Sequence, residues 1–284
     1  PTVLRNLSLA YFNKLSKESE AKELLEKAFS LDTSDSRILM ELDQLYKRLN
    51  RPHAERFSFL EQFKETAFLR DDLYLEYVTL LNQLGQYEEA IRLIDSRKFH
   101  PWEGGEGKVT AQYQLARVEM AKKYLAQGKF DEALALIEEC YTYPPNLGEG
   151  KLYGAQENDF DYYKGCAMEG LNRKEEASVL FRRASVGNSQ PAAAMYYNDQ
   201  NPDKIFYQGL ALLKLGKEVE ARGRFNNLIS YGEKHLYDVF KMDYFAVSLP
   251  DLQIWDDDMT KKNRIHCYYL MGLGHLGLGN RVKA

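Results

Sequence analysis

The 284-residue sequence has few cysteines and prolines and no strong excess of either charge. Three cysteines cannot form the disulfide framework of a small secreted domain. We therefore expect Cys140, Cys166 and Cys267 to be buried thiols in a reducing compartment, which we take to be the cytoplasm. A net charge of −4 offers no basic footprint for nucleic acid. No apolar run approaches the roughly 18 residues of a membrane span, and mean hydropathy is −0.52.

Residues 115–145 form one complete helix–turn–helix pattern. Gly128 is placed to end a first helix, and Pro144 to stop a second. Ala121 and Ala133 are small residues at the positions where the two helices would touch. This combination resembles the tetratricopeptide repeat (TPR), a helical hairpin of about 34 residues.

The same pattern recurs along the chain, with an alanine anchor preceded five residues earlier by glycine or asparagine. Anchors of this kind are Ala90, Ala133, Ala177, Ala221 and Ala284, with weaker ones at Ala21 and Ala54. Small residues precede the clear anchors at Val78, Ala121, Gly165, Gly209 and Gly272, and large residues follow at Ile94, Ile137, Phe181 and Phe225. We predict an all-α, right-handed α-solenoid of about seven hairpins.

The predicted array is a single domain over residues 1–284, with degenerate hairpins in 1–70 and clear repeats in 71–284. Because Pro1 is not an initiator methionine and Ala284 falls where a second helix would start, we expect the chain to be a piece of a longer protein.

Four insertions separate the later repeats, at 99–112, 143–161, 186–203 and 240–263. Each is predicted to lie between the second helix of one hairpin and the first helix of the next. The first two share the motif Gly-Glu-Gly-Lys, at 105–108 and 148–151. Because equivalent loops of stacked repeats emerge along one edge, the two GEGK turns should lie side by side.

The GEGK motif is not a phosphate-binding loop, because Val109 and Leu152 stand where that loop needs serine or threonine, and helices flank both copies. Two interpretations remain. In one, the glycines make tight turns and the charged residues cap or bridge helices. In the other, they line a polar ligand pocket in which Trp102 stacks on a sugar. The candidate residues are His100, Trp102, Glu103, Glu106, Lys108, Glu149 and Lys151.

The inner face of the array should be formed by the first helices, and its C-terminal half is aromatic. The candidate binding residues there are Tyr162, Tyr163, Phe206, Tyr207 and Tyr269. Because Glu119 and Asp203 also fall on this face, acidic peptide tails are poor candidates. Hydroxyl-tipped aromatics suit a sugar, an apolar peptide or a neighbouring domain. The alternative is that the insertions fold back and bury them.

The last two insertions contain aromatic residues that are expected to pack these loops onto the array. They are Met195, Tyr196, Tyr197, Tyr244, Phe245 and Trp255. The acidic run Asp256–Asp258 lacks the alternation of a calcium loop and is interpreted as a helix start. We predict no cofactor, no metal site and no catalytic residue, with a catalytic carboxylate pair left as an open alternative.

Longer motifs are more specific than the repeat pattern. They are HPWEGGEGK, NLGEGKLYGAQEND, AMYYNDQ, IFYQGLA and DYFAVSLPD. Together they resemble a bacterial family that has carried a domain-of-unknown-function label, in which a TPR array follows an N-terminal β-rich domain of the sugar-mutarotase-like type. This resemblance implies a carbohydrate-related context and gives no catalytic residue for this segment.

The favoured function is therefore a non-catalytic TPR scaffold that packs against such a β domain and helps to shape a sugar site. The partners would be protein, either within the same molecule or separate, with carbohydrate as a further ligand, and neither nucleic acid nor membrane. An independent peptide-binding adaptor is the main alternative. Part of a glycoside-processing enzyme site is the third.

Overall fold

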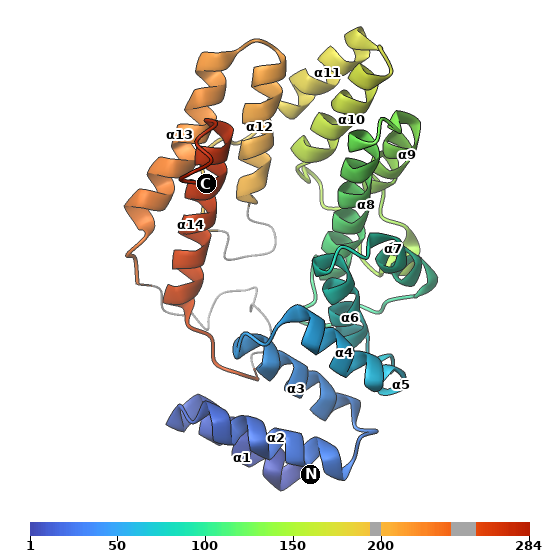
Figure 1. Cartoon of the computed structure of the whole chain (residues 1–284), viewed down its shortest axis with the longest axis vertical. Helices are drawn as coiled ribbons and strands as arrows, with labels where there is room; N and C mark the ends of the chain where they lie inside the picture. Colours follow the sequence, from blue (N-terminus) through green and yellow to red (C-terminus); the bar gives the residue numbers. More distant parts are fainter. Residues whose placement is uncertain (194–199, 240–253) are drawn as a thin grey trace. The chain divides into compact units, whose positions relative to one another are not determined.

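The computed structural model describes residues 1–193, 200–239 and 254–284, and these residues form helices, turns and loops without a β-strand (Figure 1). The helices are α1 (Thr2–Leu15), α2 (Glu18–Leu31), α3 (Ser36–Arg48), α4 (His53–Gln62), α5 (Lys64–Ala67), α6 (Asp71–Gln83), α7 (Tyr87–Ser96), α8 (Lys108–Ala126), α9 (Phe130–Cys140), α10 (Asn158–Gly170), α11 (Lys174–Ala184), α12 (Pro202–Lys214), α13 (Glu218–His235) and α14 (Met259–Gly277), with a 3₁₀ turn at Pro145–Leu147. The all-α prediction is confirmed.

The helices pair in sequence order into TPR-like hairpins. The pairs are α1/α2, α3/α4, α6/α7, α10/α11 and α12/α13, and α14 packs on α13 (Figure 1). Helices α8 and α9 share one buried cluster and form a further pair. The insertions lie as predicted, each between the second helix of one pair and the first helix of the next. Met195, Tyr196, Tyr197, Tyr244 and Phe245, which were expected to pack the last two insertions, lie outside the described residues.

The contacts within the chain separate two compact units. Unit 1 contains Pro1–Ala116, Pro144–Glu149 and the described residues 254–257. Unit 2 contains Arg117–Tyr143, the described residues of 150–239, and Asp258–Ala284. Helix α8 contributes residues to both units.

The hairpin turns share one backbone conformation. The residue that ends the first helix has a left-handed conformation, with φ of 75° at Gly85, 73° at Gly128, 61° at Asn172 and 74° at Gly216. The following N–H then donates to a carbonyl in the last turn of the helix, as Gln86 does to Leu81 at 2.9 Å. This is the Schellman geometry, which explains why glycine and asparagine recur at this position. Ser16, with φ of 52°, is also left-handed before Ala21, but here the following N–H of Lys17 donates one residue further back, to the Tyr11 carbonyl at 2.9 Å.

The two columns of small and large residues meet inside each hairpin. A Cβ atom on Gly165 would lie 2.6 Å from the Phe181 ring, and one on Gly209 would lie 2.3 Å from the Phe225 ring. In the preceding hairpin, Ala121 packs with the smaller Ile137 in one buried cluster. A larger second-helix side chain therefore faces a smaller first-helix residue, which keeps the volume between the helices filled.

The second hairpin departs from the pattern, and the prediction that Ala54 is its anchor is wrong. Ala54 is exposed, whereas Arg56 is buried, with 1% of its side chain accessible. The Arg56 guanidinium donates to Asp43 at 2.6 and 3.1 Å and to Glu76 at 2.7 Å. A buried arginine needs such carboxylate partners, because an unpaired charge in the interior is strongly unfavourable. An ion-paired network replaces the alanine contact here.

Candidate functional site

The two GEGK turns meet through Glu149, which belongs to unit 1 together with the first turn, as their repeat spacing predicted. The Glu149 carboxylate accepts hydrogen bonds from the Gly107 N–H at 3.1 Å and from the Thr110 hydroxyl at 3.1 Å. It thereby caps the start of α8, where the helix dipole favours a negative charge. Burial raises the pKa of Glu149, with Glu106 adding to this effect and the two hydrogen bonds opposing it. Glu149 of the second motif thus stabilises the first motif and the start of α8.

Trp102 is half-buried and packs on the backbone of its own loop. A Cβ atom on Gly105 would lie 2.3 Å from the indole ring, so this close approach requires glycine. Glu103, Glu106 and Lys108 are exposed around the same turn. This contact occupies part of the Trp102 ring, and a sugar-stacking role for Trp102 stays a prediction.

The start of the first insertion is tied to α6 by Asp71. This carboxylate accepts from the His100 N–H at 2.9 Å and lies 3.1 Å from the His100 Nδ1 and 2.6 Å from Arg97. Although partial burial opposes ionisation, the hydrogen bonds from His100 and Arg97 lower the pKa of Asp71. The His100 side chain is otherwise exposed, with 76% of it accessible. In unit 2, Lys151 donates to the Tyr141 carbonyl at 3.0 Å and pairs with Glu157.

Four of the five predicted inner-face aromatics form one group on the first helices of unit 2, which we call the tyrosine cluster. It consists of Tyr162, Tyr163, Phe206 and Tyr207. Neighbouring ring centroids within it lie 5.3 to 5.6 Å apart. The hydroxyls of Tyr163 and Tyr207 share a hydrogen bond of 2.8 Å. The fifth residue, Tyr269 of α14, is 51% exposed.

The tyrosine cluster combines a packed base with a partly open edge. Phe206 is buried against Phe225, with ring centroids 5.9 Å apart, while the three tyrosines are half-buried. Burial raises the pKa of Tyr163 to about 12, although the hydrogen bond shared with Tyr207 opposes this shift. Burial also raises the pKa of Tyr207, and Tyr163 adds to that effect. The cluster therefore presents neutral hydroxyls at physiological pH.

Charged groups flank the tyrosine cluster at the start of α10 and α12. Lys204 Nζ lies 2.5 Å from an Asp159 oxygen and 4.0 Å from an Asp203 oxygen. Burial opposes the charge on Lys204, but the two carboxylates outweigh it and raise the pKa of the lysine. Burial raises the pKa of Asp203. Glu119 on α8 also belongs to unit 2 and pairs with Lys122 at 2.7 Å.

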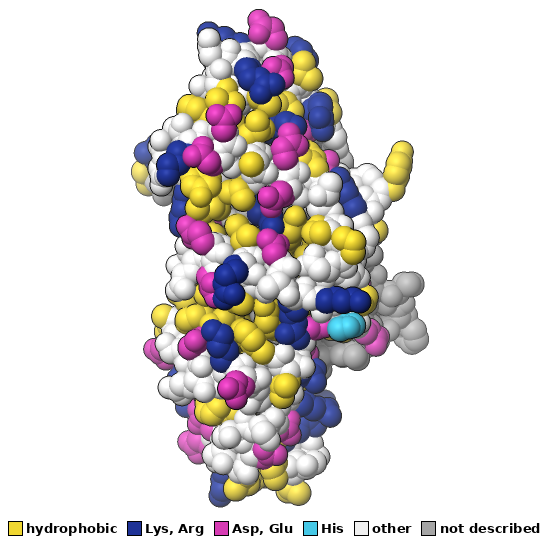
Figure 2. All heavy atoms as spheres, turned by 90° about the vertical axis from the view of Figure 1, so that its right-hand side faces the viewer, with side chains coloured by type: hydrophobic (Ala, Val, Ile, Leu, Met, Phe, Trp, Pro, Cys, Tyr) yellow, Lys and Arg dark blue, Asp and Glu magenta, His cyan; other side chains and the backbone are white. Residues whose placement is uncertain are grey.

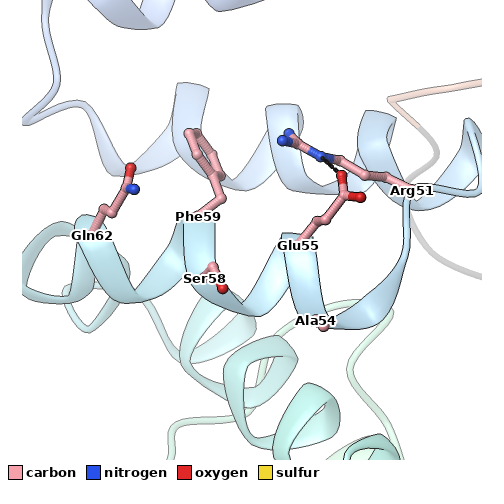
Figure 3. Close-up of a pocket in the computed structure, with 6 residues that line it drawn as sticks. All are labelled: Arg51, Ala54, Glu55, Ser58, Phe59 and Gln62. Atoms are coloured by element: carbon pink, nitrogen blue, oxygen red, sulfur yellow. Dashed lines mark hydrogen bonds and ion pairs between the residues drawn. The ribbon is translucent and has the colours of Figure 1, made fainter.

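A shallow pocket of about 340 Å³ lies on α4 in unit 1, and none of the candidate binding residues predicted from the sequence lines it. It is lined by Arg51, Ala54, Glu55, Ser58, Phe59 and Gln62 (Figure 3). Arg51 spans it, bonded to Glu55 at 3.1 Å and stacked over the Tyr46 ring at 4.2 Å. The Arg51–Glu55 contact of Figure 3 is local to one helix start and gives no sign of a ligand.

The residues that sequence reasoning missed are polar groups of α1 and α3 that hold Trp255. The indole was expected to pack, and it is fully buried in unit 1. The indole N–H donates to the Glu41 carbonyl, Arg48 donates to the Trp255 carbonyl, and Asn13 bonds to the backbone of the neighbouring Ile254 and Asp256. The repeat pattern does not single out Asn13, Glu41 or Arg48, because polar residues on helices are usually solvated.

Surface charge, helix hydropathy and metal-ligating side chains bear on which partners and ligands the chain could bind. Figure 2 shows Lys and Arg side chains interspersed with Asp and Glu over the face it presents. Within the described ranges, no helix is both long and apolar enough to cross a membrane. The same residues contain no group of three or more His, Cys, Asp or Glu side chains arranged to hold a metal ion.

Cys140 and Cys267 are buried and Cys166 is half-buried. Burial raises the pKa of the Cys140 thiol to about 12.

Comparison with known proteins leaves the family open. No family model matches the chain. Among solved structures, the chain is similar to the crystal structure of PilW, described as a widely conserved type IV pilus biogenesis factor. The two share 14% sequence identity with a TM-score of 0.42, over 81% of this chain and 92% of PilW.

Proposed function

We propose that the chain is a protein-interaction scaffold, and that the tyrosine cluster of unit 2 binds an apolar peptide segment of a protein partner. The hydrogen-bonded pair Tyr163–Tyr207 carries this proposal. Half-buried tyrosines offer a large apolar area that is already ordered, together with a hydroxyl that can pair with a peptide group. Their order limits the entropy lost on binding.

The charges around the cluster favour one kind of peptide. Glu119, Asp159 and Asp203 lie near the tyrosine hydroxyls, and Lys204 is already held between two of these carboxylates. An acidic segment would meet repulsion there, whereas an apolar segment with a basic flank would not. The preferred ligand is therefore apolar and neutral to basic.

Selection of displayed random 12-residue peptides on the immobilised chain tests this function. We expect enriched peptides to be apolar with basic flanks, and to bind Tyr163→Ala and Tyr207→Ala at least ~10-fold more weakly, as anchor residues of an interface do. Tyr153→Ala is the matched control, because that tyrosine is fully exposed elsewhere in unit 2. Enrichment of acidic peptides whose binding depends on Tyr163 and Tyr207, or equal binding to all three variants, would refute the proposal.

The carbohydrate-related part of the sequence interpretation stays a proposal with less structural support. Glu149 already caps α8 and Trp102 already packs on Gly105, so these contacts account for both residues without a sugar. Glycan-array binding by the chain, abolished by Trp102→Ala in a folded variant, would establish the sugar site. An array without signal would leave the GEGK residues with their structural role.

A further inference from the structure

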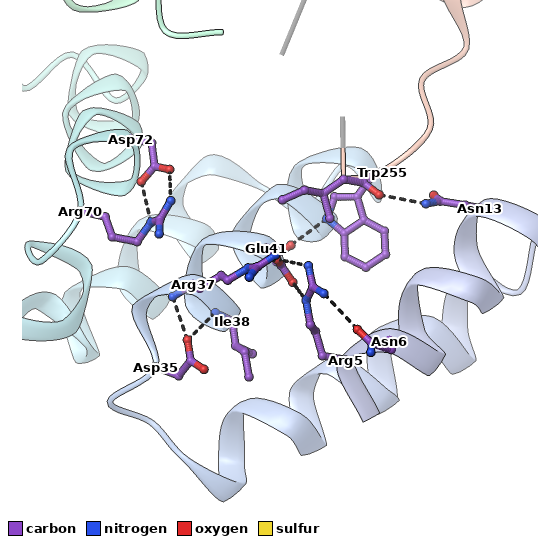
Figure 4. A network of polar contacts seen from close by, with 11 residues as sticks. Arg5, Asn6, Asn13, Asp35, Arg37, Ile38, Glu41, Arg70, Asp72 and Trp255 are labelled. Atoms are coloured by element: carbon purple, nitrogen blue, oxygen red, sulfur yellow. Dashed lines mark hydrogen bonds and ion pairs between the residues drawn. The ribbon is translucent and has the colours of Figure 1, made fainter. Parts of the chain in front are cut away.

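Trp255 occupies a built site on the first hairpins of unit 1. Its side chain is 0% exposed although it belongs to a short non-helical segment, residues 254–257. The indole N–H donates to the Glu41 carbonyl at 3.0 Å (Figure 4). The ring also meets Phe12 edge-on, with centroids 5.2 Å apart. A tryptophan whose only polar atom is also satisfied is a typical anchor of a recognised peptide.

The site also binds the backbone on both sides of the anchor. Asn13 of α1 donates from its amide to the Ile254 carbonyl at 2.9 Å and accepts from the Asp256 N–H at 3.0 Å. One side chain thus holds the donor and the acceptor that flank Trp255. Simple burial of an apolar ring would not need this pairing, whereas recognition of a peptide does.

Arg48 of α3 binds the C-terminal, acidic side of the segment. Its guanidinium donates to the Trp255 carbonyl at 3.1 Å and lies 3.2 Å from the Asp257 carboxylate. Both partners of this ion pair are mostly buried, with 20% and 15% of their side chains accessible. The pair is therefore shielded from solvent more than an exposed pair would be.

The wall of the site is held together by contacts that do not involve the segment. The Glu41 side chain is fully buried and accepts from Arg5 at 2.5 and 2.6 Å and from Arg37 at 3.1 Å (Figure 4). These contacts link α1 to α3 and fix the turn of α3 whose carbonyl receives the indole. A site whose supporting residues are paired among themselves can persist when its occupant leaves.

We propose that this surface is a peptide-binding site for a protein segment with an apolar residue, a tryptophan and acidic residues in succession, and that residues 254–257 are its built-in occupant. A partner carrying the same pattern would take the site when the resident segment is weakened or released. Tethering gives the resident segment a high effective concentration, so the native chain should bind such a partner only weakly.

The test uses the chain with Trp255→Ala and a fluorescein-labelled peptide Ile-Trp-Asp-Asp-Asp, followed by fluorescence anisotropy. We expect the variant to bind the peptide at least ~10-fold more tightly than the native chain does, because the site has lost its resident anchor. Adding Asn13→Ala or Arg48→Ala should abolish most of this gain. Asn6→Ala is the matched control on α1, because Asn6 contacts Arg5 and not the segment.

A second variant keeps the test decisive if Trp255→Ala fails to fold, as judged by circular dichroism. Trp255→Phe retains a ring against Phe12 but loses the indole N–H, and should bind the peptide with intermediate affinity. A folded variant that binds no better than the native chain overturns the proposal. Equal binding of a peptide with alanine in place of tryptophan also overturns it. So does dimerisation of the native chain through exchange of this segment, which would assign the site to a second copy.

Discussion

Gly148 illustrates how one residue fixes the meeting of the first two insertions. Its φ is 73°, and a Cβ atom would lie 2.7 Å from the Phe99 carbonyl oxygen. Phe99 itself is buried and donates its N–H to the Asn146 carbonyl at 2.8 Å. Asn146 in turn donates to the carbonyls of Ile94 and Arg97, each at 3.0 Å. A side chain at position 148 would force the two loop segments around Phe99 and Gly148 apart.

Replacing Gly148 with alanine should therefore lower the free energy of unfolding by about 1–3 kcal/mol, the range for strain at a disfavoured backbone conformation. Urea denaturation of the native chain and the variant measures this. Gly150→Ala is the control, because position 150 has open space around a Cβ and no positive φ. Similar midpoints for the two variants would show that the Phe99 contact relaxes easily.

At the scale of the helical hairpin, the contact between first and second helix is a matched pair of volumes. Gly165 against Phe181 and Ala121 against Ile137 fill the same gap, and the smaller first-helix residue is paired with the larger second-helix side chain. Neither member of a pair can change alone without overpacking or leaving a cavity. The repeat therefore tolerates sequence variation at these positions mainly as coupled changes.

Gly165→Ala should destabilise unit 2 by about 1–3 kcal/mol, because the added methyl meets the Phe181 ring. Combining it with Phe181→Ile recreates the pair of the preceding hairpin and should recover part of that loss. A double-mutant cycle in urea gives the coupling energy, which we expect to be favourable and in the range of 0.5–3 kcal/mol for contacting residues. Additive effects would mean that the two positions do not compensate.

For the molecule as a whole, the two compact units predict local rather than global responses to mutation. In repeat arrays each element is stabilised mainly by its neighbours. Gly148→Ala should accordingly speed amide exchange in α6 and α7, and Gly165→Ala should do so in α10–α12. Hydrogen exchange with mass spectrometry resolves these segments. Equal acceleration in both units from either substitution would show that they open together.

The sequence alone determined the helical hairpins, because their signals are local. A left-handed turn residue and small and large residues at fixed spacing must act within one hairpin, and Gly128, Ala121 and Ile137 do so. The repeat step also predicted that the GEGK turns meet, since equivalent positions of stacked repeats are neighbours. It placed Tyr163 and Tyr207 at equivalent positions of successive repeats, and the structure adds the hydrogen bond between their hydroxyls. The prediction for Ala54 was wrong because any alanine at that spacing matches the pattern, whether or not the residue is buried.

Only the tertiary structure decided which polar groups share the interior. Arg56 is buried because Asp43 and Glu76 converge on it from two other helices, and no spacing rule within α4 signals that. Asn13 and Ile254 are separated by 241 positions in the sequence, so their hydrogen bond depends on where the chain returns. Periodicity encodes contacts between neighbouring elements, whereas contacts between distant segments depend on the path of the folded chain.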